Sequence, residues 1–135
     1  ECIGVYVSSL NGCHYCVEHH FQGMRRLVGD DARSDALRAA IEADQLAGAP
    51  LDAREIAGMG YARKLTVEPA AMIERDVEAL RLVGLDDGEI LEINQVTAYF
   101  CYANRTVLGL GVNTDGDIIG LSPNNSDDPE DWGHR

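Results

Sequence analysis

The chain has 135 residues, 45% of them apolar but few aromatic, and only four prolines, which is typical of a helical domain with its own core. Its 23 acidic and 11 basic residues give a net charge of −12, and so acidic a chain repels phosphate backbones and anionic lipid. Nucleic acid and membrane surfaces are therefore not expected partners.

No apolar run approaches the roughly 20 residues of a membrane span, and no signal peptide is visible. The chain carries one CxxC pair and two scattered cysteines, which is not the pattern of a disulfide framework. We therefore expect a single cytoplasmic domain that covers residues 1–135, with a reactive pair at Cys13 and Cys16.

The first elements surround this cysteine pair. Residues 2–10, "CIGVYVSSL", fit either a short helix or a strand, and Asn11-Gly12 ends the element. The following stretch, 13–28, is predicted as a helix that Gly29 terminates. Its expected common face consists of Cys13, Cys16, Val17, His20, Met24 and Leu27.

Three helices are predicted in the middle of the chain. The first covers 34–48 with Ser34 or Asp35 as its cap, and the second covers 53–65 after Asp52. Gly58 and Gly60 weaken the second helix but allow a neighbouring helix to approach closely. The third helix is expected over 66–85.

The longest helix is expected over 86–111, where Asp86 and Glu89 have capping-box spacing. Residues 112–135 have no helical period and many turn residues, which predicts an extended C-terminal tail. Trp132 indicates that the tail packs on another surface, although the alternative of a disordered tail remains open.

The pair Cys13-His14-Tyr15-Cys16 is the main chemical feature. Val17 stands where covalent haem attachment needs a histidine, so haem is not expected. A structural zinc site needs four ligands, and Glu1, Cys13, Cys16 and His20 are the available set, which keeps a metal-binding module as an alternative.

A redox dithiol fits the spacing better, because sulfurs one helical turn apart can form a bridge. Cys13 lies at a helix start, where the helix dipole stabilises a thiolate, whereas His20 lies four residues after Cys16 and can take its proton. Residue His19 points about 100° away from His20 around the helix and is expected in solvent.

The pattern E-x11-C-x2-C-x3-H, from Glu1 to His20, resembles the active site of the alkylhydroperoxidase D-like family of the carboxymuconolactone decarboxylase superfamily. The wording "SSLNGCHYCVEHH" is similar to its peroxidase-related branch, and similarity continues through "DVEALRLVGLDDGEILEI", "AYFCYANR" and "DDPEDWGHR". The resemblance implies an all-α fold, a homo-oligomer and N-terminal helices that precede Glu1.

The resemblance also implies a role for each site residue. Cys16 would be the thiolate that attacks a hydroperoxide, Cys13 the resolving cysteine, His20 the proton relay, and Glu1 the carboxylate behind it. An external dithiol would restore the pair, without cofactor or metal. The family's additional histidine before the second cysteine is replaced by Tyr15, and His14 stands one position earlier, so both are auxiliary candidates.

Three other functions compete with thiol-dependent peroxide reduction. One is the metal-binding module, and another is an oligomer whose thiols only sense oxidant. The third is lactone decarboxylation, which the sequence argues against, because superfamily members with that activity do not depend on a CxxC pair.

Overall fold

The structure, a computed structural model, describes residues 1–120 of the chain. Within these residues the regular elements are all helical: α1 (Cys2–Leu10), α2 (His14–Val28), α3 (Asp31–Glu42), α4 (Ala53–Val67), the 3₁₀ turn η1 (Pro69–Ala71), α5 (Glu74–Leu82) and α6 (Asp87–Gly109). The predicted all-α fold is confirmed for this part of the chain. None of the described helices has the length and apolarity needed to cross a membrane.

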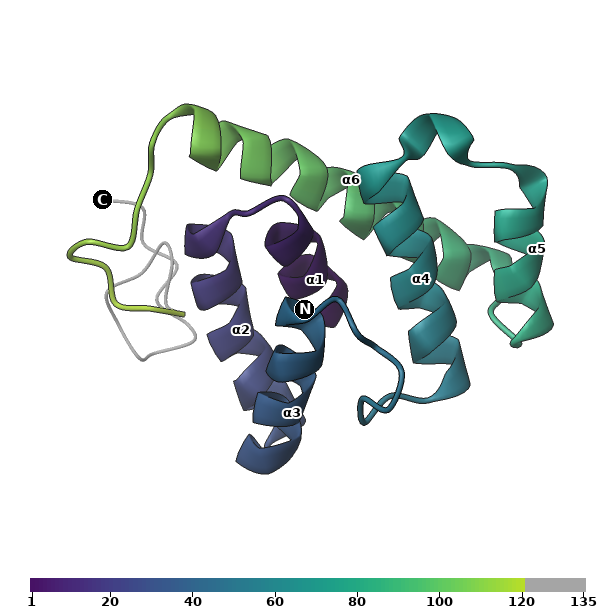
Figure 1. The fold of residues 1–135 in the computed structure, drawn as a ribbon, viewed down its shortest axis with the longest axis horizontal. Helices are drawn as coiled ribbons and strands as arrows, with labels where there is room; N and C mark the ends of the chain where they lie inside the picture. The colour runs from purple at the N-terminus through teal and green to yellow at the C-terminus, as the bar shows by residue number, and fades with distance from the viewer. Residues whose placement is uncertain (121–135) are drawn as a thin grey trace.

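The central helix is α1, which packs against α2, α3, α4 and α6 (Figure 1). The sequence of this segment fitted either a helix or a strand. In the structure it is a helix with five consecutive buried residues, Gly4 to Ser8. In Figure 1, α2 and α3 lie on one side of α1, α4 lies on the other, and α6 runs across the top. Because α1 and α2 are joined by a short turn, the cysteine pair at the start of α2 follows directly after the central helix.

The main apolar core lies among α1, α2, α3 and α4. Tyr6 and Phe21 contribute its largest side chains, together with Val5, Val17, Met24, Leu37, Ile41 and Met59. A second cluster joins α1, α4 and α6 through Val7, Ala62 and Phe100. Leu27 was expected on the buried face of α2 but is 77% exposed, and on this last turn Val28 packs against the core instead.

Several helix ends follow the predicted signals. Gly29 terminates α2 with φ +64°, the left-handed conformation that glycine adopts most easily. Asp52 and Asp86 each cap a helix, and each forms a reciprocal capping box with the glutamate three residues later. Gly58 permits the predicted close approach, since a Cβ there would lie 3.2 Å from Ile93 Cδ1, whereas Gly60 faces open space.

Three boundary predictions were wrong. Helix α3 ends at Glu42 and not at Gly48, because Asp44 adopts a positive φ of 51° that a right-handed helix cannot continue. The cap of α3 is Asp30, not Ser34 or Asp35, because the Asp30 side chain accepts from the Arg33 N–H, and the Ser34 hydroxyl donates to the Asp30 carbonyl from inside the helix. The predicted helix 66–85 is broken at Pro69, which cannot donate a helical hydrogen bond, and the preceding Glu68 leaves the helical conformation with φ −136° and ψ 58°. Only 74–82 forms α5.

Residues 112–120 contain no regular element, in agreement with the predicted tail. This segment descends from the end of α6 toward α2 (Figure 1). At its end Gly120 contacts α2, because Arg26 donates to the Gly120 carbonyl and the Gly120 N–H donates to His19. Trp132 and the rest of the predicted tail lie outside the described residues.

Candidate active site

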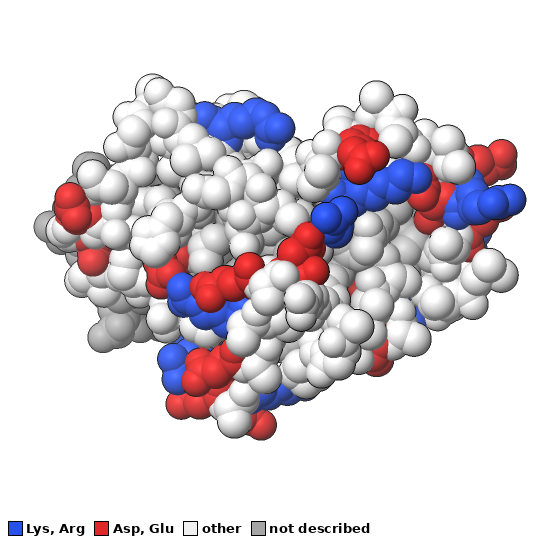
Figure 2. All heavy atoms as spheres, in the orientation of Figure 1, with Lys and Arg blue, Asp and Glu red and all other residues white. Residues whose placement is uncertain are grey.

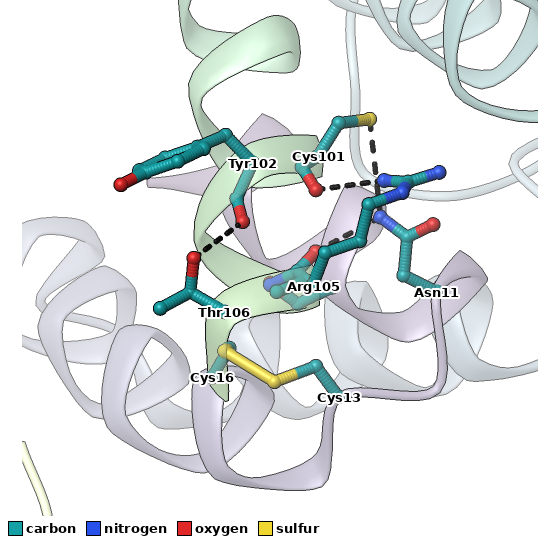
Figure 3. The surroundings of a disulfide bond; sticks show 9 residues. Asn11, Cys13, Cys16, Cys101, Tyr102, Arg105 and Thr106 are labelled. Carbon is teal, nitrogen blue, oxygen red and sulfur yellow. Dashed lines mark hydrogen bonds between the residues drawn. A yellow bond between two sulfur atoms is a disulfide. The ribbon is translucent and has the colours of Figure 1, made fainter. Parts of the chain in front are cut away.

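Cys13 and Cys16 form a disulfide at the start of α2, with their Cα atoms 5.4 Å apart (Figure 3). Cys13 is the N-cap residue of α2 and is fully buried, whereas Cys16 lies in its first turn and retains 5% exposure. The CxxC pair is therefore at a helix N-terminus, as predicted from the sequence.

The turn before α2 is held by backbone hydrogen bonds. The Cys13 N–H donates to the Ser8 carbonyl at 2.9 Å, and the Gly12 N–H donates to Ser9 at 3.0 Å. Gly12 has φ +69°, which lets the chain reverse between two helices within three residues. The sequence Asn11-Gly12 thus forms a helix-to-helix turn that delivers Cys13 to the core.

A cleft of about 560 Å³ lies between α2 and α6. Its walls combine aromatic and small apolar side chains with a few polar groups: Glu1, Tyr15, Cys16, His19, His20, Gly23, Arg26, Tyr99, Phe100, Ala103, Val107 and Gly120. Cys16 lines this cleft, whereas Cys13 is not part of its walls. A molecule that enters from solvent would therefore meet Cys16 first.

Glu1 and His20 meet at the cleft, where Glu1 Oε2 lies 3.0 Å from His20 Nδ1. This hydrogen bond is the main reason that the pKa of Glu1 lies below the ordinary value of a glutamate, despite partial burial that acts in the opposite direction. An ionised carboxylate only accepts, so His20 Nδ1 carries the proton and Nε2 is left as an acceptor.

Two further contacts fix this pair. The His20 ring packs edge-on against Phe100 of α6, with ring centroids 4.7 Å apart. Gly23 lies beneath the carboxylate of Glu1, and a Cβ at this position would stand 3.3 Å from Glu1 Oε2. Gly23 therefore provides the space into which the Glu1 carboxylate fits.

The prediction that His19 lies in solvent was wrong, since this residue is only 7% exposed. Its Nδ1 accepts the Gly120 N–H at 3.2 Å, and its ring lies against Tyr15 with centroids 4.4 Å apart. Its Nε2 is 3.4 Å from Asp117 Oδ2 but has no hydrogen-bond partner within residues 1–120. The segment that covers His19 is about 100 residues away in sequence, which explains the error.

The two auxiliary candidates lie in different surroundings. Tyr15 lines the cleft beside Cys16. His14 is 77% exposed, its Nδ1 lies 3.8 Å from Glu18 Oε1, and it is not among the cleft-lining residues. Only Tyr15 is therefore placed to contact a molecule in the cleft.

The alternative set of metal ligands does not converge. In the described range, no three His, Cys, Asp or Glu side chains form a group that could hold a metal ion. Cys13 and Cys16, two of the four residues in that set, are instead bonded to each other.

Sequence reasoning missed several cleft residues. Gly23 lies seven residues after Cys16, on the helical face of Cys16, so the periodicity alone could have indicated it, whereas His19 enters the cleft wall beside Gly120. Tyr99 and Phe100 come from α6, and no local pattern links α6 to the cysteine pair.

Comparison with known proteins places this geometry in a family. No family model matches the chain, and no curated protein matches it. A solved structure described as an uncharacterized peroxidase-related protein from Silicibacter sp. TM1040 is 35% identical, with a TM-score of 0.72 over 82% of this chain and 55% of that one.

A second solved structure is described as an alkylhydroperoxidase AhpD core, an uncharacterized peroxidase-related protein from Ralstonia eutropha JMP134. It is 28% identical, with a TM-score of 0.73 over 83% of this chain and 56% of that one. The chain thus spans a little over half the length of these relatives. With its helical fold and its CxxC pair at the start of α2, the chain belongs to the peroxidase-related proteins of the alkylhydroperoxidase D-like family.

Proposed function

We propose that the protein is a thiol peroxidase that reduces hydroperoxides through the Cys13–Cys16 dithiol and disulfide. The observation that carries this proposal is the placement of Cys16 in the wall of a cleft that also holds the Glu1–His20 pair. A cysteine, a histidine and a carboxylate that orients the histidine are the parts of an activated thiol nucleophile.

In the first step, His20 Nε2 accepts the proton of the Cys16 thiol. The Glu1 carboxylate favours this transfer because it stabilises the imidazolium that forms. The Cys16 thiolate attacks the terminal oxygen of the hydroperoxide, the O–O bond breaks, and the alcohol leaves with the proton from His20. Cys16 is then a sulfenic acid.

In the second step, Cys13 attacks the sulfenic sulfur. The S–S bond forms, the S–O bond breaks, and the hydroxyl leaves as water with the proton of Cys13. An external dithiol then reduces the disulfide and is itself oxidised. The position of Cys13 behind Cys16, away from the cleft, supports its role as the resolving cysteine.

Single cysteine variants test this proposal. Cys16→Ser and Cys13→Ser should both abolish continuous consumption of cumene hydroperoxide with dithiothreitol, and only Cys13→Ser should retain a sulfenic acid that dimedone labels. Cys101→Ser, which changes a half-buried cysteine of α6, is the matched control and should keep the parent rate. Unchanged turnover in both Cys16→Ser and Cys13→Ser would disprove the assignment.

The same measurement separates catalysis from oxidant sensing. A protein that only senses peroxide consumes about one equivalent, forms its disulfide and stops even with dithiol present. The proposed enzyme continues until the dithiol is exhausted.

Homo-oligomerisation is a further part of this proposal. It is supported by exposed apolar side chains of α6, namely Leu91, Tyr102 and Leu108. Light scattering on the purified protein tests it, since a mass of one chain at micromolar concentration would contradict it.

A further inference from the structure

A chain of polar side chains connects α6 to the turn that carries the cysteines. Asn104 Nδ2 donates to Ser8 Oγ at 3.0 Å, and Asn104 Oδ1 accepts from Asn11 Nδ2 at 2.9 Å. Asn104 and Ser8 are both fully buried, and Asn11 is half-buried. Both ends of the Asn104 amide are therefore satisfied by the segment just before Cys13.

These contacts hold the turn from both sides. Ser8 accepts the Cys13 N–H through its own carbonyl at 2.9 Å, while its hydroxyl is held by Asn104. Asn11 caps the end of α1 and is separated from Cys13 only by Gly12. In Figure 3, Asn11 points from the turn toward α6, where its amide nitrogen also approaches Cys101 Sγ at 3.9 Å.

A buried amide with two partners constrains geometry more than an apolar contact does. Its donor and acceptor are both satisfied only when Ser8 and Asn11 keep their present positions, and a buried amide left without partners is destabilising. Gly12 itself adds no side-chain contact to the turn, since it is exposed and a Cβ at this position would meet nothing within 4 Å, so the side-chain contacts of the turn are those of Ser8 and Asn11.

We propose that Asn104 is the positioning residue for Cys13, an inference that rests on the proposed dithiol cycle. The step it serves is resolution, in which Cys13 attacks the Cys16 sulfenic acid, the S–S bond forms, and the S–O bond breaks with release of water. When the disulfide is reduced, no covalent bond holds the two sulfurs together, and the contacts of the turn decide their separation. Positioning raises the effective concentration of Cys13 at the Cys16 sulfur.

The proposal predicts a selective defect in Asn104→Ala. After one equivalent of peroxide, sulfenic acid should form at Cys16 at the parent rate, because the Glu1–His20 pair is untouched. Disulfide formation should be about tenfold slower or more, so that dimedone-reactive sulfenic acid accumulates. The equilibrium constant for oxidation by glutathione should fall about tenfold, which corresponds to about 30 mV.

Two further variants separate positioning from general stability. Thr97→Val also removes a fully buried polar group from α6, but within residues 1–120 its hydroxyl bonds only to the Ile93 carbonyl of the same helix. It should leave both redox readouts unchanged. Asn11→Ala removes the hydrogen bond from Asn11 Nδ2 to Asn104 Oδ1. Because Asn11 is only half-buried, this variant folds even if Asn104→Ala does not. It should show the same slow formation of the disulfide.

The inference is overturned if Asn11→Ala, and Asn104→Ala where it folds, form the disulfide at the parent rate, or if Thr97→Val slows disulfide formation equally. A parent protein that forms no sulfenic acid with peroxide would instead overturn the proposed function. In that case the glutathione equilibrium of the parent and the variants still decides whether Asn104 holds Cys13 against Cys16.

Discussion

Glu1 is the site residue whose charge can be removed with the least change in shape. Its hydrogen bond with His20 lowers its pKa below the ordinary value of a glutamate, so the carboxylate is ionised at neutral pH. Glu1→Gln should therefore slow sulfenic acid formation at Cys16 by about tenfold or more, part of the roughly 10²–10⁴ that a positioned base contributes. Stopped-flow mixing with peroxide measures this rate.

The ratio of the parent rate to the Glu1→Gln rate should be constant between pH 5 and 8, because the Glu1 carboxylate does not titrate there. It should shrink only as pH falls through the lowered pKa and the parent carboxylate is neutralised. Glu78→Gln makes the same chemical change on the exposed face of α5 and is the control. Equal rates for Glu1→Gln and the parent would remove Glu1 from the mechanism.

Tyr6 anchors α1 to a charged pair outside the site. Its buried hydroxyl donates to Asp44, which also receives three guanidinium hydrogen bonds from Arg63. Since Arg63 remains bonded to Asp44 and this carboxyl is 36% exposed, Tyr6→Phe should cost only about 1 kcal/mol of unfolding free energy at pH 7. Urea unfolding measures the loss.

The pH dependence of this loss has a defined sign. Arg63, and next Tyr6, lower the pKa of Asp44, so its stabilisation is present above about pH 3.9 and is lost as pH falls through the lowered value. The difference in unfolding free energy between Tyr6→Phe and the parent should therefore become smaller near pH 3. Tyr102→Phe, at an exposed position of α6, should change the unfolding free energy neither at pH 7 nor near pH 3.

At the scale of the elements, the close approach of α1 and α6 depends on Gly4. A Cβ at this position would overlap the ring of Phe100, which packs edge-on against His20. Gly4→Ala should cost about 1–3 kcal/mol of unfolding free energy and also slow peroxide reduction, because the displaced ring shifts His20. Denaturant unfolding and the rate of sulfenic acid formation measure the two effects.

Gly60→Ala provides the opposite case. Gly60 lies in α4, and a Cβ added to it would meet no other atom within 4 Å, so alanine there should stabilise the protein by up to about 1 kcal/mol without a change in rate. If both alanine variants behaved alike, the packing of α1 on α6 would not control the site.

At the scale of the elements, some features of the structure could be predicted from the sequence and others could not. Local signals, such as the Asp86 capping box and the Gly29 stop, gave correct helix ends because they depend on neighbouring residues alone. The periodicity of α2 likewise put Cys16 and His20 on one face. His19 was misplaced because its burial depends on Gly120, and the contribution of Phe100 depends on the packing of α6 against α1. Such contacts follow from tertiary structure rather than from local pattern.

At the scale of the whole molecule, the distribution of charged side chains affects which reductant approaches the protein most readily. Figure 2 shows basic and acidic side chains next to one another across the visible face. Six basic residues of the described chain form ion pairs with acidic neighbours: Arg25, Arg38, Arg54, Arg63, Lys64 and Arg81. Most positive charge is thus locally neutralised, and the acidic excess of the chain remains. A neutral dithiol or a basic partner therefore approaches more readily than an anionic thiol.

A dithiol cycle also requires that the whole molecule stay folded after reduction. The Cys13–Cys16 bridge closes a loop of only four residues, which in the chain-entropy model contributes about 2 kcal/mol. Typical domains have about 5–15 kcal/mol of stability, and the apolar core among α1 to α4 does not depend on the bridge. The reduced protein should therefore keep its helical circular dichroism at 25 °C, with a midpoint lowered by no more than about 10 °C.

Thermal unfolding with and without a phosphine reductant measures this shift. The double variant Cys13→Ser/Cys16→Ser, which cannot form the bridge, should unfold near the midpoint of the reduced parent and should not respond to reductant. If the parent lost its helical signal at 25 °C on reduction, the bridge would be a structural requirement rather than a reaction intermediate. A small shift that reverses on reoxidation is the behaviour that repeated turnover needs, because each cycle breaks and re-forms this bond.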